Sequence, residues 1–575
     1  MQHTEIIFVK SFTHFFHSLK IASLKRIYSL TKKEFVLFVG CIFLIIFGII
    51  GFFNSISNSF SVAVPTYGGN LTEGILGNPR FINPVLAVSD IDQDLTQIVY
   101  SGLVRKISDG SLESQIIPDL AESYSISEDG KIYTFTIKDT AVFHDKKPVT
   151  AYDVAFTIQT IQDTRLQSPE FNNWFGVTTE IIDAKTIAII LPRAFSGFLE
   201  NATVGILPAH IWGNFSPEEF LASTYNNQPI GSGPYKLKNI NRDKNGVPTN
   251  YIFTAFNRFT LQKPYIQKVT INIYPNEELL LSAYQKGDIA LLGGIRPYAL
   301  DISIKKNTLT TPLPRMFGLF LNPEKKNIFK DQQLVNLLKS TISSKSIIDS
   351  VFQGYAQEIS HPFPELHQKN KDLLSPEEIK QRLETLGWKT NPETGIRVKN
   401  NTPLSFTIAT ADTAELKYTA QLIQQQLQVL GIQTEIEVFQ LNDLENSVIK
   451  PRNFDALLFG QFIRNDADIY AFWHSSQTTD PGLNITRFSS RKLDTAIETL
   501  FETIDPEKRN DLLVTIQEET ANAPIIWLYQ PNFIYATRKN INGIYLQSLI
   551  NRKDRFTNIY QWYLYTDTIW KIFNK

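Results

Sequence analysis

The chain has 575 residues, and at roughly 100–200 residues per domain this length predicts about three to five domains or lobes. Hydrophobic residues make up 43% and charged residues 20%, a globular composition that excludes disorder, collagen and coiled coil as the main architecture. The 56 basic and 57 acidic residues give a net charge of −1, whereas a general nucleic-acid binder is basic. The single cysteine, Cys41, excludes an intramolecular disulfide and a zinc site built from cysteines.

The N-terminal region predicts a membrane anchor. Residues 35–53 carry no charge, and as a helix they would span about 28 Å, close to a bilayer core of roughly 30 Å. Residues 1–34 hold six Lys or Arg and two Glu, which predicts a cytoplasmic tail and places the rest of the chain outside. A cleaved signal peptide is the alternative, but the apolar run is longer than the usual signal-peptide core. A buried core helix is disfavoured because the run has no polar face.

The part that follows predicts mixed α and β structure. Residues 54–66 are rich in Ser and Asn without a hydrophobic period, which indicates a short tether. Residues 131–138 alternate apolar and polar side chains, which predicts a strand with one buried face. Thr150 is expected to cap the next helix, with Asp153 in its first turn.

A strand–helix–strand unit is predicted nearer the C-terminus. Apolar residues alternate over 404–408, and a helical period follows Asp412, a candidate N-cap with Glu415 three residues later. Gly431 stands where a left-handed C-terminal cap belongs, and alternation resumes over 432–438. The length of this crossover favours parallel pairing of the two strands.

Common catalytic motifs are absent from the sequence. It contains no zinc-protease, serine-hydrolase, P-loop or dinucleotide-binding pattern, and no cysteine outside the predicted anchor. The histidines of the exported part are scattered rather than set at metal-ligand spacing: His144, His210, His361, His367 and His474. We therefore expect no catalytic residue, no metal site and no cofactor. A pair of carboxylates brought together by the fold would support one alternative, an exported hydrolase.

Six short motifs follow one another along the exported part. They are PRFINP at 79–84, IVYSGL at 98–103, PDLAE at 118–122, SISEDGKIYTFTI at 125–137, VFHDKKPVTAYDV at 142–154 and IGSGPY at 230–235. Together they resemble the extracellular solute-binding proteins of ABC transporters, family 5, the oligopeptide-, dipeptide- and nickel-binding type. The resemblance covers roughly residues 67–565.

The resemblance implies an α/β fold with two lobes, of the periplasmic-binding-protein type, with an extra subdomain in the N-terminal lobe. Such lobes close on a ligand at a hinge. The expected division is 1–34 cytoplasmic basic tail, 35–53 transmembrane anchor, 54–66 tether, 67–103 first part of lobe I, 104–228 extra subdomain, 229–313 second part of lobe I, 314–529 C-terminal lobe and 530–575 return to lobe I.

The resemblance also implies a function outside the cell. It predicts a monomer, tethered to the cell membrane, that captures peptides or similar small solutes for an ABC importer and is not an enzyme. The domain would lie in the extracellular or periplasmic space. A ligand sensor or receptor without transport is an alternative from a different class, which the predicted cytoplasmic tail makes conceivable. A permease gene beside this gene would distinguish the two.

Candidate ligand contacts follow from the same resemblance. The aspartate that neutralises a peptide amine in relatives falls on Asn465, next to Asp466, when the segments are matched without a gap. Asp466 and Asp468 are equally well interpreted as solvated loop residues. Tyr470 and Trp473 are candidates for stacking on a ligand, although Trp473 more simply fits the core. Further candidates for the cleft are Asp92, Asp94, Asn257 and Arg258.

Overall fold

The structure is a computed structural model and describes residues 31–107, 115–195, 197–296, 308–363, 366, 373–503, 505–538, 540–546 and 549–570. It divides into two units. One comprises Met1–Thr66 and Tyr565–Lys575, and the other Tyr67–Leu564.

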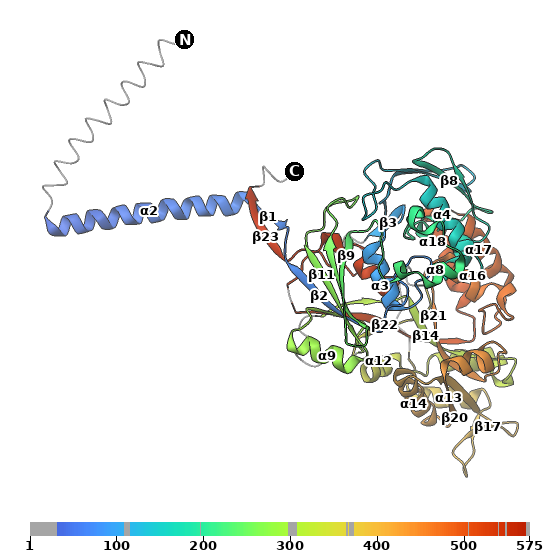
Figure 1. Cartoon of the computed structure of the whole chain (residues 1–575). Helices are drawn as coiled ribbons and strands as arrows, with labels where there is room; N and C mark the ends of the chain where they lie inside the picture. The colour runs from blue at the N-terminus through green and yellow to red at the C-terminus, as the bar shows by residue number, and fades with distance from the viewer. Residues whose placement is uncertain are drawn as a thin grey trace. The chain divides into compact units, whose positions relative to one another are not determined.

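The first unit contains one long helix and a two-stranded ribbon (Figure 1). The helix α2 (Lys32–Phe60) has its N-cap at Thr31, whose backbone N–H donates to Glu34 at 2.8 Å. It is followed by β1 (Ser61–Thr66), which pairs antiparallel with β23 (Tyr565–Trp570). The residues predicted as a tether are thus the end of α2 and all of β1. Residues 565–570, which fall within the predicted return to lobe I, pair with β1.

The predicted anchor lies inside α2. Across the residues that the structure describes, no helix combines the length and the apolar character that a membrane crossing requires. The anchor at 35–53 stays a prediction.

The second unit is built around a large mixed sheet. Its described strands follow the order β20-β19-β21-β14-β22-β12-β2-β11-β10-β9, and β13 and β15 also pair with β22. The strands are β20 (Gln433–Phe439), β19 (Ser405–Ala411), β21 (Ala456–Phe462), β14 (Arg315–Leu321), β22 (Ile525–Thr537), β12 (Leu291–Gly293), β2 (Asn70–Leu76), β11 (Lys268–Tyr274), β10 (Pro248–Ala255), β9 (Tyr235–Arg242), β13 (Thr308–Pro312) and β15 (Ala356–Glu358).

The strand β22 runs through both lobes. Its residues up to Tyr529 pair with β14, and those from Asn532 onward pair with β13 and β12. The buried apolar residues separate at the same place. One core consists of residues from Met316 to Tyr529, and the other combines residues up to Leu291 with residues from Phe533 onward. This separation gives the unit its two lobes, called here the first lobe (β2, β9–β13) and the second lobe (β14, β19–β21).

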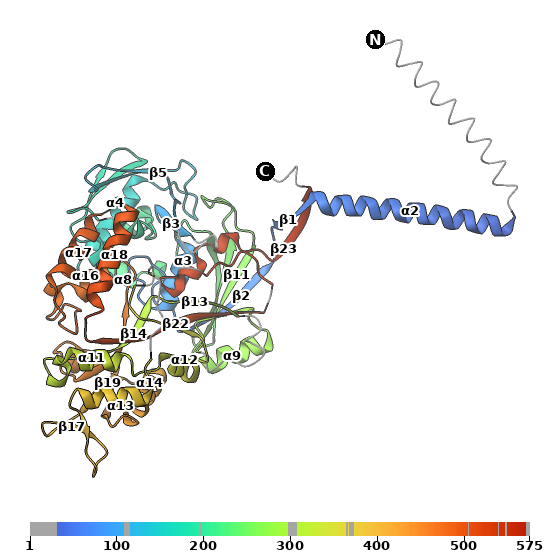
Figure 2. The ribbon, with the colours of Figure 1, turned by 180° about the vertical axis from the view of Figure 1, so that it is seen from behind.

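The extra subdomain of the first lobe has its own antiparallel sheet, in the order β5-β6-β8-β7. Its strands are β5 (Ala121–Ile126), β6 (Ile132–Ile137), β8 (Thr186–Ile190) and β7 (Thr178–Ile181), and α4 (Ala151–Gln162) packs on β7 and β8. Figure 2 shows β5 and α4 of this subdomain. The strand predicted over 131–138 is confirmed as β6. Thr150 is the N-cap of α4, and its hydroxyl donates to Asp153 at 2.7 Å.

The predicted strand–helix–strand unit is confirmed in the second lobe. It consists of β19, α14 (Ala414–Gln428) and β20, and the two strands pair in parallel. The predicted N-cap is wrong by one residue. The chain is extended at Thr413, whose hydroxyl accepts from the N–H of Leu416 at 3.4 Å, while Asp412 forms an ion pair with Lys417. Gly431 has the expected left-handed conformation, with φ of 77°.

The remaining elements connect and cover these sheets. The helices are α3 (Asp90–Val99), α5 (Phe171–Trp174), α6 (Phe198–Asn201), α7 (Ala209–Trp212), α8 (Pro217–Ala222), α9 (Glu277–Lys286), α11 (Gln332–Lys339), α12 (Ser344–Phe352), α13 (Pro376–Thr385), α15 (Leu441–Asp443), α16 (Asp466–Trp473), α17 (Arg491–Glu502) and α18 (Pro506–Thr520). The short strands are β3 (Val104–Ile107), β4 (Gln115–Pro118), β16 (Lys389–Thr390), β17 (Arg397–Lys399) and β18 (Thr402–Pro403), and the short 3-10 helix η6 covers Arg552–Phe556.

A glycine turn holds the C-terminal end of α3 in place. A Cβ atom on Gly231 would lie 2.2 Å from the carbonyl oxygen of Val99, so the turn accepts no side chain there. The N–H of Gly231 donates to Nδ1 of His144 at 3.3 Å, and the Nε2–H of His144 lies 3.1 Å from the carbonyl oxygen of Gly233. Because Nδ1 accepts, the turn binds the neutral form of the imidazole. Burial lowers the pKa of His144 to about 4, and the nearby Lys236 acts in the same direction.

We expect His144 to make the stability depend on pH. The unfolded chain takes up a proton on this histidine near its ordinary pKa of about 6.5, whereas the folded protein does so only near 4. The free energy of unfolding should therefore fall by roughly 1–2 kcal/mol as the pH drops from about 6.5 to 4, after a reduction for partial exposure to water. Urea unfolding at several pH values would measure this slope. In His144→Gln, which keeps a donor and an acceptor, the slope should be shallower; an unchanged slope would contradict the role of His144.

Candidate functional site

A cavity of about 250 Å³ lies between the first lobe, its extra subdomain and the second lobe. Its walls come from parts of the chain that are far apart in sequence. The lining residues are Pro84, Ala87, Gln93, Thr96, Gln97, Tyr100, Gly102, Val104, Arg105, Lys106, Asp119, Glu170, Asn173, Glu200, Asn201, Thr203, Val204, Gly205, Arg464, Asn465, Ala467, Asp468, Ile550, Asn551, Lys553, Asp554 and Thr557. Most of these side chains are polar or charged, so the cavity is suited to a hydrophilic ligand.

One face of α3 forms the wall of the first lobe. The cavity residues Gln93, Thr96 and Gln97 recur at the spacing of neighbours on one helix face. The buried residues Ile91 and Leu95 lie on another face and belong to the core of the first lobe. The helix thus presents amide and hydroxyl groups, which can donate and accept hydrogen bonds, to the cavity.

Most charges in the lining are already paired within the first lobe. Arg105 and Asp119 form a buried ion pair at 2.7 Å, and Lys106 and Glu200 form a half-buried one at 2.7 Å. Asp554 accepts from the backbone N–H groups of residues 550 and 551 at 2.9 and 2.7 Å. These groups shape the wall, and their charges are largely compensated before a ligand arrives.

The wall of the second lobe is the start of α16 and the residue before it. Asn465 is the N-cap of α16, and its side-chain oxygen accepts from the N–H of Asp468 at 3.2 Å. Arg464 donates to both carboxylate oxygens of Asp468, at 2.9 and 3.0 Å. The bond to Asp468 raises the pKa of the Arg464 guanidinium, and the negative charges of Glu170 and Glu200 act in the same direction from the extra subdomain. Charges of opposite sign therefore meet across the cavity.

The predicted segment 465–473 is split between the cavity and the interior of the second lobe. Asn465 and Asp468 line the cavity, whereas Asp466 does not. Asp466 is buried, and Nη2 of Arg509 lies 2.8 and 3.0 Å from its two carboxylate oxygens. Trp473 is buried in the core of the second lobe, beside Trp527.

An aromatic contact joins the extra subdomain to the second lobe. The ring of Phe195 lies 5.6 Å from that of Phe501 on α17, and the guanidinium of Arg193 lies over the Phe501 ring at 5.4 Å. Phe501 also makes an edge-to-face contact with Tyr470, with ring centroids 5.8 Å apart. Tyr470, a predicted ligand contact, therefore supports this contact between lobes and does not line the cavity.

The other predicted site residues serve the frame of the first lobe. Asp92 accepts from the backbone N–H groups of residues 80 and 81 at 2.7 and 2.9 Å, which holds the segment before α3. Asp94 forms a buried ion pair with Arg555 at 2.6 Å. Asn257 and Arg258 are exposed in the connection between β10 and β11. None of these four residues lines the cavity.

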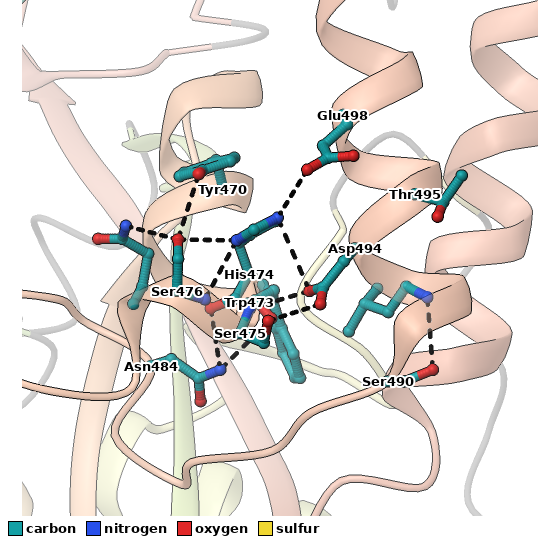
Figure 3. A network of polar contacts seen from close by, with 12 residues as sticks. Tyr470, Trp473, His474, Ser475, Ser476, Asn484, Ser490, Asp494, Thr495 and Glu498 are labelled. Atoms are coloured by element: carbon teal, nitrogen blue, oxygen red, sulfur yellow. Dashed lines mark hydrogen bonds and ion pairs between the residues drawn. The ribbon is translucent and has the colours of Figure 1, made fainter.

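A polar network holds the connection that follows α16 (Figure 3). Nδ1 of His474 lies 2.8 Å from the hydroxyl of Ser476 and 3.2 Å from its backbone N, and Nε2 lies 3.3 Å from Glu498. Ser475 donates to Asp494 through its N–H at 2.9 Å and its hydroxyl at 2.6 Å. The Ser–His contact joins residues two apart in sequence, so it caps a turn. The bonds of Ser475 to Asp494 and of His474 to Glu498 fasten this connection to α17.

The cavity lining offers mainly hydrogen-bonding groups. Its donors and acceptors are carboxylates, amides, hydroxyls and basic groups, and the described residues of the lining include no His or Cys. In the described part of the chain, no three His, Cys, Asp or Glu side chains are grouped as a metal site would require.

Sequence reasoning missed several cavity residues. The polar face of α3 had a signal, because Gln93, Thr96 and Gln97 alternate with apolar residues at helical spacing. Arg464 adjoins the predicted segment. Glu170 and Lys553 had no local signal, since only the packing of distant segments brings them to one cavity.

Comparison with known proteins identifies related chains. Residues 115–482 match the family model described as bacterial extracellular solute-binding proteins, family 5. The oligopeptide-binding protein AppA of Bacillus subtilis is 27% identical over 525 residues, which cover 88% of this chain and 93% of AppA. The nickel-binding periplasmic protein of Escherichia coli is 26% identical over 469 residues, 75% of this chain and 84% of that protein.

A solved structure agrees with the architecture. The ABC transporter substrate-binding protein CtaP of Listeria monocytogenes superposes with a TM-score of 0.72 at 25% identity. The superposition covers 87% of this chain and 100% of the CtaP chain.

Proposed function

Since the chain belongs to the bacterial extracellular solute-binding proteins of family 5, whose members are non-enzymatic binding proteins, we propose that it captures a peptide or peptide-like solute in the cavity between its lobes and delivers it to an ABC importer.

The observation that carries this proposal is the composition of the cavity walls. Polar groups of the first lobe, the extra subdomain and the second lobe line one cavity, and the lobes are connected through β22 and the link between β13 and β14. A ligand that touches both lobes stabilises the closed form over the open one, because its contacts exist only when the lobes meet.

A peptide is the cargo that the lining favours. Amide and hydroxyl side chains such as Gln93, Gln97 and Asn465 can bond to the backbone of a peptide of any sequence, which gives affinity without selecting side chains. The relative AppA carries the name of an oligopeptide-binding protein. A nickel ion bound directly by protein ligands is less suited to a lining without His or Cys.

We further propose where the protein acts. Residues 35–53 would hold it in the cell membrane, with the basic N-terminal tail inside the cell and the folded unit Tyr67–Leu564 outside. The binding unit would work as a monomer that meets its permease through the closed form.

A peptide library tests the function. The purified protein would be incubated with random-sequence tetrapeptides, and the bound peptides identified by native mass spectrometry. Retention of peptides would support the proposal. Retention of no peptide, by a protein that is folded, would overturn it.

Closure on the ligand is a separate prediction. A bound peptide should shorten the radius of gyration measured by small-angle scattering and raise the melting temperature, because a ligand of the native state adds to its stability. The contact of Phe501 with Arg193 and Phe195 should help to hold the closed form. Phe501→Ala should open the ligand-free protein and weaken peptide binding about three- to tenfold, since aromatic and cation–π contacts each contribute about 0.5–1.5 kcal/mol.

An exposed aromatic residue of the extra subdomain, which also carries Arg193 and Phe195, provides the control. Phe175 is 69% exposed, so Phe175→Ala should change neither the scattering profile nor the affinity. If the Phe501 variant has the scattering profile and affinity of the parent, this contact does not hold the lobes together.

A further inference from the structure

Two charges in the cavity lack an ion-pair partner among the described residues: Glu170, which faces the charge of Arg464 across the cavity only at longer range, and Lys553. Glu170, just before α5, accepts a hydrogen bond from the side-chain amide of Asn173 at 2.8 Å, and among the described residues no cation lies within ion-pair distance of it. Lys553, in η6, is half-buried and has no carboxylate within that distance among the same residues. One negative and one positive charge therefore remain for a ligand.

The aspartates expected to meet a ligand amine are less available. Asp466 lies outside the cavity lining and is bound by Arg509, and Asp468 is held on both oxygens by Arg464. Recruiting either one would require breaking an existing ion pair. Glu170 is different, because it holds one amide contact and no ion pair, so an incoming ammonium group would have no ion pair to break.

Resting on the proposed function, we propose that the ligand is a zwitterion, a short peptide with both ends free, whose ammonium group binds Glu170 and whose carboxylate binds Lys553. This arrangement transfers recognition of the amine from the second lobe to the extra subdomain. It leaves the middle of the peptide to the amide and hydroxyl groups of the lining. A charged hydrogen bond of this kind corresponds to a loss of at least about tenfold in affinity when one partner is made neutral.

The experiment compares three forms of one ligand. A random-sequence tetrapeptide library is prepared with free ends, with acetylated N-termini and with amidated C-termini, and each form is titrated against the parent and against Glu170→Gln and Lys553→Gln. The matched controls are Glu180→Gln and Lys131→Gln, which make the same changes at exposed positions outside the cavity. Circular dichroism and the urea midpoint establish that each variant is folded.

The expected result is a crossed pattern. The parent and both controls should prefer free ends at least about tenfold over either blocked form. Glu170→Gln should lose the preference for a free amine and keep that for a free carboxylate, and Lys553→Gln should do the reverse.

The results distinguish a failure of the zwitterion inference from a failure of the proposed function. Binding of all three forms with equal affinity by the parent, or an unchanged preference in both variants, would overturn the zwitterion inference and leave peptide binding intact. Binding of no form by the folded parent would overturn the proposed function itself.

Discussion

Replacement of Arg555 by methionine should lower the free energy of unfolding by about 3–5 kcal/mol, because it leaves buried carboxylates without their cation. Arg555 donates to Asp94 at 2.6 and 2.7 Å and to Glu73 at 2.8 and 3.0 Å. Its side chain is 1% exposed, and those of both acids are 0% exposed. The ion cluster joins β2, α3 and η6, so it also fixes two walls of the cavity.

The loss should depend on pH. Burial raises the pKa of Glu73, and the charge of Arg555 opposes this rise, so the pKa should be higher still in the variant. A carboxyl group with a raised pKa in the folded state favours folding at low pH, and this contribution is lost as the pH rises through that pKa. The difference between variant and parent should therefore be largest near neutral pH and smaller near pH 5.

Urea unfolding of both proteins at several pH values measures this effect. Arg165→Met is the matched control, because Arg165 pairs with Asp163 at the surface and is 67% exposed. The control should keep the unfolding midpoint of the parent. A loss in Arg555→Met as small as in the control would show that the buried carboxylates find other partners.

Local patterns predicted local structure well. The alternation at 131–138 became β6, and the change of period after residue 411 became β19, α14 and β20, because the buried face of each element has the period of that element. The N-cap at Thr413 was missed by one residue, since Asp412 and Thr413 are both good caps and the backbone conformation decides between them. The pairing of β1 with β23 had no local signal, because its partners stand at opposite ends of the chain.

The site was harder to predict than the fold. The resemblance pointed to the segment around Asn465, and Asn465 and Asp468 do line the cavity. It did not show that Asp466 would be bound to Arg509, because the partner belongs to another helix. Glu170 and Lys553 come from segments whose meeting depends on the packing of whole lobes. The sequence indicated which segment lies at the site. It did not indicate which side chains of that segment are already bound by other residues of the protein.

Replacement of Asp466 by alanine should reduce stability without changing the preference for peptides with free amines. Nη2 of Arg509 binds both oxygens of Asp466, and its Nη1 donates to the carbonyl oxygens of Leu500 and Thr503 at 3.1 Å each, at the end of α17. The aspartate thus holds the arginine that secures this helix end. We expect a loss of about 2–3 kcal/mol, below that for a fully buried pair because Arg509 is 24% exposed.

Asp468 offers the matched control, two residues along the same helix. It lines the cavity but pairs with Arg464, which is 44% exposed, so Asp468→Ala should cost less than about 1 kcal/mol of stability. Binding of free and N-acetylated tetrapeptides to Asp466→Ala should keep the ratio found for the parent. A variant that is as stable as the parent, yet binds both forms equally, would make Asp466 the partner of the ligand amine. The ion pair with Arg509 would then have to open when the ligand binds, and the amine site would return to the second lobe.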